Sequence, residues 1–121
     1  MTTQDVANDL VALCKQGKFA ESGEKYWADD VGSVEPGAPG GGDPVSRGIE
    51  AARGKGEWWS SNNEVHDVEA EGAYVSGDQF AVRFKMDITP KANGQRMTID
   101  EMAVYTIKEG KIAEERFFYG G

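Results

Sequence analysis

Apolar residues near the start of the chain recur every three or four positions, a spacing that is typical of amphipathic helices. Val6, Leu10 and Cys14 lie on one such stripe, which predicts a first helix over Gln4–Gln16. A second stripe of the same period predicts another helix over Lys18–Ala28. We expect these two helices to form a short hairpin at the start of the fold.

A third helix is predicted to begin near Gly48 and to end at Asn62. Over this stretch Ile49, Ala52 and Trp59 lie on one helix face. The two glycines inside it each cost a helix roughly 1 kcal/mol relative to alanine. Packing of the apolar face must therefore supply most of the stability of this helix.

Alternation of apolar and polar residues dominates the second half of the chain and predicts strands. The clearest one is Phe80–Ile88, where every second residue is apolar. The other predicted strands are Val31–Pro36, Val65–Tyr74, Arg96–Ile107 and Ile112–Tyr119, the last two joined by a tight turn. This order of elements predicts an α+β fold, in which helices cover one face of a curved antiparallel sheet.

The segment Gly37–Pro44 interrupts this pattern with four glycines and two prolines in eight residues. Neither a helix nor a sheet tolerates that composition, so we predict a mobile loop. It could close over a ligand as a lid, or it could serve only as a spacer. It is not a phosphate-binding loop, because no Lys followed by Ser or Thr opens a helix after it.

Composition and charge fit a single domain over residues 1–121 and exclude several kinds of partner. The chain has 21 Asp and Glu against 13 Lys and Arg, a formal net charge of −8. This charge repels phosphate backbones and anionic lipids, so we expect no nucleic-acid partner and no membrane partner. One cysteine and one histidine exclude an internal disulfide and provide no metal signature. With no secretory signal in view, a cytoplasmic protein is expected.

Several short motifs occur in an order that resembles a known family. They are Trp27-Ala-Asp-Asp30, Glu35-Pro36, Arg47-Gly-Ile49 and the terminal hairpin around Tyr105–Ile112. Together they resemble the SnoaL-like branch of the nuclear transport factor 2-like superfamily, over nearly the whole chain. The resemblance implies a cone-shaped α+β barrel with three N-terminal helices on the concave face of the sheet. It also implies an apolar pocket and a homodimer through the sheet.

Glu35 is the first candidate for chemistry in such a pocket. It follows Asp30 by five residues and precedes a proline, as the general base does in the ketosteroid isomerases that this segment resembles. If Glu35 faces the cone, burial would raise its proton affinity and suit it to move a proton between carbon positions. The alternative is an exposed residue at the end of a strand.

The C-terminal hairpin is expected to supply further carboxylates. The predicted register pairs Lys108 with Lys111, Thr106 with Ala113, Val104 with Glu115, Met102 with Phe117 and Asp100 with Tyr119. The shared face is mostly apolar but carries Asp100, Glu115 and the Tyr119 hydroxyl, a composition typical of a ligand cavity. Glu101 would then lie on the opposite face. A single β-bulge would exchange the two sets of residues.

The resemblance leaves open which chemistry is performed. Asp100 lies close to the place of the acid that holds the oxyanion in the isomerases, whereas their first-helix tyrosine is absent, since Leu10 and Val11 occupy that region. Glu115 lies where SnoaL-like proteins often have a polar pocket residue, although it could equally pair with Arg116 or Arg83.

The remaining candidates are pocket walls and two residues that we interpret as inert. The walls expected beside Phe117 and Met102 are Tyr26, Trp59 and Phe84. His66 alternates within an acidic strand and is interpreted as a surface residue. Cys14 lies on the apolar stripe of the first helix and is interpreted as a buried thiol.

Two functional hypotheses follow. In the first, the protein is an enzyme without a cofactor that moves a proton in a small apolar, carbonyl-containing ligand, with Glu35, Asp100 and Glu115 as catalytic residues. In the second, it is a non-catalytic ligand-binding or dimeric scaffold domain. The superfamily contains both kinds of protein, so the fold alone does not choose between them.

Overall fold

The computed structural model describes residues 1–36 and 44–119. Most of the predicted Gly37–Pro44 loop therefore lies outside the described residues. The helices are α1 (Thr3–Lys15), α2 (Phe19–Tyr26) and α3 (Ile49–Asn62). The strands are β1 (Trp27–Val34), β2 (Val45–Arg47), β3 (Asn63–Ser76), β4 (Gln79–Pro90), β5 (Met97–Lys108) and β6 (Lys111–Phe118).

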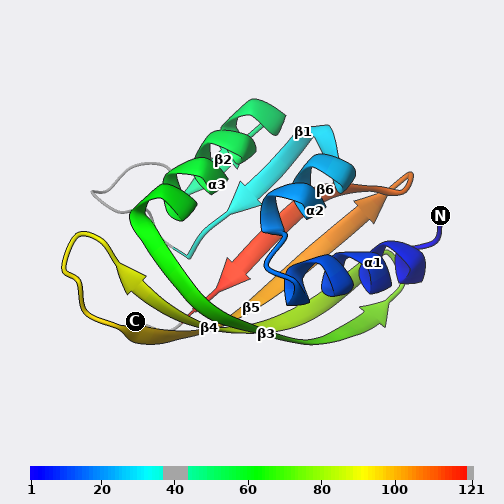
Figure 1. Ribbon diagram of the computed structural model, residues 1–121. Coiled ribbons are helices and arrows are strands. Elements are labelled where there is room, and N and C mark those ends of the chain that lie inside the picture. The colour runs from blue at the N-terminus through cyan, green and yellow to red at the C-terminus, as the bar shows by residue number, and fades with distance from the viewer. Residues whose placement is uncertain (37–43, 120–121) are drawn as a thin grey trace.

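The strands form one curved sheet in the order β2-β1-β6-β5-β4-β3, and the helices lie on its concave face (Figure 1). This confirms the expected α+β cone with three helices. Two details differ from the sequence prediction. The β1 and β6 strands pair in parallel, so the sheet is mixed, and β2 and β3 remain separate edges, so the sheet is open. An open sheet leaves access to its concave face.

Helix α1 is built as the hydrophobic periodicity predicts. Thr2 and Asp5 form a capping box at its N-terminus, with each side chain accepting a hydrogen bond from the other residue's backbone N–H. Val6, Leu10 and Cys14 are buried against the sheet. None of the described helices is long and apolar enough to cross a membrane.

The junction of α2 and β1 lies earlier than the sequence predicts. The helix ends at Tyr26, because Trp27 has extended backbone angles and pairs with Ile112 on β6. Apolar residues continue past this point, so the helical period alone did not reveal the end of α2. Strand β2 was not predicted, since its three residues are too few to show alternation.

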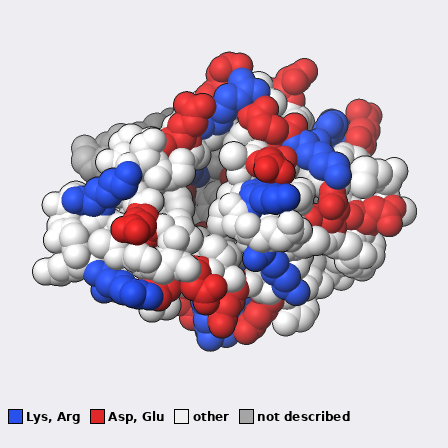
Figure 2. Space-filling model, in the orientation of Figure 1, with Lys and Arg blue, Asp and Glu red and all other residues white. Residues whose placement is uncertain are grey.

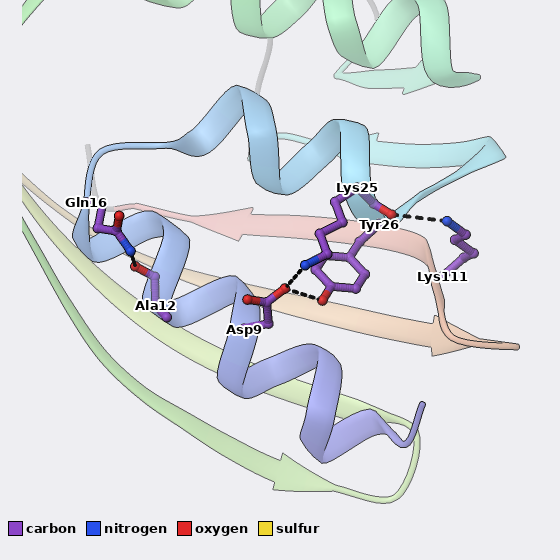
Figure 3. Close-up of polar contacts among 6 residues, drawn as sticks. All are labelled: Asp9, Ala12, Gln16, Lys25, Tyr26 and Lys111. Carbon is purple, nitrogen blue, oxygen red and sulfur yellow. Dashed lines mark hydrogen bonds and ion pairs between the residues drawn. The ribbon is translucent and has the colours of Figure 1, made fainter.

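Helices α1 and α2 are tied together by one carboxylate (Figure 3). Asp9 on α1 accepts hydrogen bonds from Lys25 Nζ at 2.6 Å and from the Tyr26 hydroxyl. The Lys111 ammonium, from the start of β6, donates to the Lys25 carbonyl oxygen at 3.1 Å. Tyr26 therefore lies buried between the helices, which corrects its expected place on a pocket wall.

The core lies between the helices and the concave face of the sheet. The alternation predicted for β4 is confirmed, since its apolar positions are all buried: Phe80, Val82, Phe84, Met86 and Ile88. Their polar neighbours on β4 are turned to the convex face. Strand β4 thus fixes which face of the sheet is inside.

The register of the β5–β6 hairpin differs from the prediction and changes which residues face inward. Lys108 pairs with Lys111 as expected, but a bulge follows the next pair, Ile107 and Ile112. Beyond the bulge Tyr105 pairs with Glu115, and the remaining pairs include Ala103 with Phe117 and Met102 with Phe118. One extra residue in β6 turns Glu115 and Phe117 to the same face as Tyr105 and Ala103 on β5, and not to the face of Asp100 and Met102.

Candidate active site

The concave face of the sheet and the helices enclose a cavity of about 1470 Å³. Figure 2 shows the helix-bearing side of the molecule hollowed near its middle. Most of the lining is apolar, with Trp59, Phe84 and Phe117 among the expected walls that do border it. The cavity exceeds the roughly 300–1,000 Å³ of common small-molecule sites, so space does not limit the ligand.

Glu115 on β6 is the most deeply buried carboxylate of this cavity, with 8% of its surface exposed. The Trp27 indole N–H donates to its Oε1, and the Ser33 hydroxyl donates to its Oε2 at 3.1 Å. Burial raises the pKa of Glu115, and these two donors oppose the rise. Neither Arg116 nor Arg83 is its partner, since those guanidinium groups pair with other carboxylates.

A glycine on α2 allows Trp27 to reach Glu115. A Cβ atom added at Gly23 would overlap the Trp27 indole ring, which packs directly against the Gly23 backbone. Position 23 of α2 therefore requires glycine, because any side chain there would occupy the space of the Trp27 ring. Trp27 itself lies at the first position of β1.

Glu35 lies just beyond β1 and is held from the opposite wall by Lys55 on α3. The Lys55 ammonium is 2.8 Å from Glu35 Oε1, donates to Ser33 Oγ at 2.7 Å, and lies 4.8 Å from the Phe117 ring centre. The other oxygen, Glu35 Oε2, is buried and has no hydrogen-bond partner among the described residues. One oxygen is thus fixed by Lys55, and the other is buried without such a contact to the described residues.

Glu101 on β5 faces the same cavity, because it pairs with the inward-facing Phe84 on β4. Burial, and then the charge of Glu35, raise the pKa of Glu101 to about 7, while the Lys55 charge opposes the rise. Within residues 1–36 and 44–119, no hydrogen bond or ion pair reaches its carboxylate.

Tyr119 borders the cavity near Glu35, as the sequence predicts for its face. Burial and the neighbouring Glu35 charge raise the pKa of its hydroxyl to about 12. The hydroxyl therefore keeps its proton at neutral pH and can act only as a hydrogen-bond donor or as a neutral acceptor.

Asp100 and Met102 correct the sequence prediction. Both alternate with the inward-facing Glu101 on β5 and therefore point to the convex side of the sheet. Asp100 is among the residues that border the cavity, but its side chain is half exposed and accepts two hydrogen bonds from Arg83, at 2.9 and 2.6 Å. Met102 has 37% of its surface exposed and does not border the cavity.

Two other side chains match their inert interpretations. His66 is exposed and hydrogen-bonded to Thr89 at 2.7 Å. Cys14 is buried, and this burial raises the pKa of its thiol to about 12. In the part of the chain that the structure describes, no three His, Cys, Asp or Glu side chains are grouped closely enough to hold a metal ion.

Sequence reasoning missed Lys55 and Glu101. A signal for Lys55 was present, because it lies three residues after Ala52 and four before Trp59, on the inward stripe of the predicted third helix. A lysine on an apolar stripe is a candidate for a buried ion pair. Glu101 lies inside because it alternates with the buried Ala103 and Tyr105 on β5, a face that the predicted hairpin register had placed opposite to the cavity.

Comparisons with known proteins agree with this fold. A family model described as a SnoaL-like domain matches residues 1–119. A proposed SnoaL-like polyketide cyclase from Mesorhizobium loti is 55% identical, and the match covers 98% of this chain and 100% of that one with a TM-score of 0.91. No curated protein matches the chain.

Two more distant structures share the architecture. A proposed isomerase from Bacillus subtilis is 17% identical over 99% of this chain and 90% of its own, with a TM-score of 0.80. A protein from Catenulispora acidiphila with a ketosteroid isomerase-like fold, solved in complex with trimethylamine, is 18% identical over 91% of this chain and 81% of its own, with a TM-score of 0.71. At such identities the likeness concerns the fold alone.

Proposed function

Because this chain belongs to the SnoaL-like domain family, we propose that it catalyses proton transfer at carbon in a small, mainly apolar carbonyl compound, without a cofactor. A ketone whose α-carbon loses a proton to form an enolate is the simplest substrate of this kind. Isomerisation or ring closure of a larger carbonyl compound would begin with the same step. The family membership supports the reaction class, and the cavity residues support the roles below.

One observation carries the proposal, namely that Glu35 Oε2 is buried and accepts no hydrogen bond from residues 1–36 or 44–119. A general base needs a free oxygen lone pair that faces the substrate and stays in one place. Lys55 holds the other oxygen at 2.8 Å, so the carboxylate cannot easily turn away. In this proposal Oε2 accepts the proton from carbon and can return it to another carbon of the same substrate.

Glu101 supplies the complementary group. An enolate oxygen is stabilised by a hydrogen-bond donor placed where negative charge develops. With its pKa raised to about 7, Glu101 keeps its proton at mildly acidic pH, and in about half of the molecules at pH 7, and can donate it to that oxygen. Glu101 takes the role that the sequence reasoning gave to its neighbour Asp100.

The proposal is tested by deuterium uptake from D₂O into β-tetralone, an apolar ketone with an acidic α-carbon. We expect the wild-type protein to accelerate uptake, and Glu35→Gln to lower kcat by about 100-fold or more, the usual contribution of a general base. The rate should also fall as the pH rises above about 7, because Glu101 then loses its proton. Nuclear magnetic resonance measures the uptake directly.

The matched control is Asp87→Asn, which removes a carboxylate of an ion pair on the convex face. It should keep the wild-type rate. Uptake that is equal in wild type and Glu35→Gln would contradict the proposal. A protein that binds β-tetralone without accelerating uptake would favour the second hypothesis, a ligand-binding domain without chemistry, which the mainly apolar lining also suits.

The homodimer through the sheet stays a prediction. Its support is the exposure of Met97, Met102 and Phe118 on the sheet strands. The cytoplasmic location likewise stays a prediction.

A further inference from the structure

We propose that Lys55 is a positioning residue, held in place by a hydrogen-bonded relay through Ser33 to the buried Glu115, and that it fixes the orientation of Glu35 in the cavity. This inference rests on the proposed function, in which Glu35 accepts the proton. In this inference Lys55, Ser33 and Glu115 position the catalytic base and do not themselves touch the reacting atoms.

The ammonium group of Lys55 has three directions of contact, and all are occupied. It meets Glu35 Oε1 at 2.8 Å, Ser33 Oγ at 2.7 Å and the face of the Phe117 ring at 4.8 Å. An ammonium carries three N–H donors, so little capacity remains for a ligand. Lys55 is therefore suited to hold Glu35 rather than to bind an anionic substrate itself.

The hydroxyl of Ser33 gives the relay a direction. Ser33 has one proton, which it donates to Glu115 Oε2 at 3.1 Å. Its oxygen is then left as an acceptor, and this is what Lys55 requires. The Glu115 carboxylate fixes the Ser33 hydroxyl, and the Ser33 hydroxyl in turn fixes the Lys55 ammonium.

The far end of the relay is rigid. Glu115 accepts a second hydrogen bond from the Trp27 indole, which packs against Gly23 on α2. Glu115 and Ser33 are both buried, with 8% and 1% of their surfaces exposed. Lys55 is thus anchored to the interior of the sheet, although it belongs to a helix at the cavity wall.

Helix α3 needs such an anchor. Ala52 is its one buried residue, and glycines flank Lys55 on both sides. The helix also lacks a side-chain hydrogen bond at its N-cap. Without the polar contacts to Ser33 and Glu35, little on α3 would set the place of the Lys55 side chain.

Lys55 also serves as the shared counter-charge of the cavity. Its charge lowers the pKa of Glu115 and of Glu101, against the burial that raises both. Arg53, two residues earlier, is engaged on the outside by Glu24 and Glu50. Displacing Lys55 should therefore disturb all three cavity carboxylates.

Two variants test the relay by its kinetics. Lys55→Met removes the ammonium at nearly constant length, and we expect kcat for β-tetralone exchange to fall by roughly 100-fold, with KM little changed, because Glu35 loses its fixed orientation. Ser33→Ala should lower kcat by about 10-fold, since Lys55 keeps only one polar partner. Ser33→Thr retains the hydroxyl and should restore most of the rate, whereas the matched control Ser76→Ala, on the exposed end of β3, should have no effect.

A second measurement does not depend on activity. Acetic anhydride acylates free lysine side chains, and mass spectrometry compares the labelling of Lys55 with that of the exposed Lys91. We expect Ser33→Ala to increase the relative labelling of Lys55 several-fold and Ser33→Thr to leave it near the wild-type value. A wild-type kcat, or unchanged Lys55 labelling, in Ser33→Ala would overturn the relay. Ser33→Ala could increase the labelling of Lys55 as expected while Glu35→Gln keeps the wild-type rate. That result would refute the proposed function but would support the conclusion that Ser33 holds Lys55 in place.

Discussion

The pKa values of carboxyl groups are shifted in opposite directions on the two faces of the sheet. On the convex face Asp87 and Asp100 each receive two hydrogen bonds from an arginine, and these bonds lower the pKa of both carboxyl groups. On the concave face Glu101 and Glu115 are largely buried, and burial raises their pKa. A carboxylate in water with its own guanidinium stays charged, whereas one in an apolar cavity with a shared ammonium holds its proton more strongly.

Asp100 and Glu101 make this contrast sharpest, because they are neighbours in the chain. Their side chains point to opposite faces, as successive residues of any strand do. The Asp100 carboxylate forms an ion pair with Arg83 and is half exposed, whereas the Glu101 carboxylate is largely buried. Asp100 is therefore a charged surface group and Glu101 a candidate catalytic acid only because their side chains lie on opposite faces of β5.

The largest effect is expected from Glu101→Gln, which should change how the stability of the protein depends on pH. Its pKa is about 7 in the fold, against 4.5 for an unperturbed glutamate. The folded protein thus keeps a proton that the unfolded chain has released, so wild-type stability falls as the pH rises from 4.5 to about 7. Glu101→Gln should remove this fall and be more stable than wild type above pH 7 by up to about 3 kcal/mol, at about 1.4 kcal/mol per pKa unit.

Urea unfolding at about pH 5 and about pH 8.5 checks this prediction. Asp87→Asn is the opposing case from the convex face. Arg96 lowers the pKa of Asp87, so its contribution is present at neutral pH and is lost as the pH falls below the ordinary aspartate value of 3.8. Equal pH profiles for the two variants would erase the contrast between the faces.

A smaller effect is expected from Gly23→Ala, which tests the packing behind the cavity carboxylates. The new methyl group would push the Trp27 indole away from Glu115. Overpacking of this kind costs about 1–3 kcal/mol and outweighs the gain of about 1 kcal/mol in helix propensity. The net result should be a protein about 1–2 kcal/mol less stable, as measured by urea unfolding.

Gly54→Ala on α3 is the matched control. Nothing lies within 4 Å of a Cβ atom at Gly54, so the same substitution should stabilise the protein by about 0.5–1 kcal/mol. Stabilisation by both substitutions would mean that Trp27 moves freely, and the tight packing behind Glu115 would be refuted.

The smallest effect is expected from Asp100→Asn. It removes an exposed ion pair with Arg83, a kind of interaction that adds little to stability. Deuterium uptake into β-tetralone should stay at the wild-type rate, although the sequence pattern had suggested a catalytic role for this residue. A loss of kcat as large as that of Glu35→Gln would return Asp100 to the active site and remove the distinction between the two faces.

Local patterns predicted much of the framework. The apolar stripe of α1 and the alternation in β4 indicated the right elements and the right inward faces. Glu35, expected beside the cavity from its motif resemblance to the ketosteroid isomerases, does border it, as do Phe84, Phe117 and Trp59, which were expected as walls. These features depend on residues close in the sequence, so the sequence displays them directly.

The errors have one kind of cause, which is pairing between distant segments. The bulge in β6 places Glu115 and Phe117 on the same face as Glu101, where the predicted register had placed them with Asp100 and Met102. A strand pattern of period two contains no sign of such an insertion. The early end of α2 follows from the parallel pairing of Trp27 with β6.

The sequence by itself therefore determined the α+β class and the helices and strands of the core, because periodicity and composition are local properties. The cavity and the place of Glu35 beside it were expected only from the resemblance of its motifs to the SnoaL-like family. Only the tertiary structure decided which carboxylates face that cavity and what holds them. Lys55, Ser33 and Glu115 come from a helix and two strands that are far apart in the chain. Their meeting depends on strand register and helix placement, and the free energy that sets both comes from long-range packing rather than from any short stretch of residues.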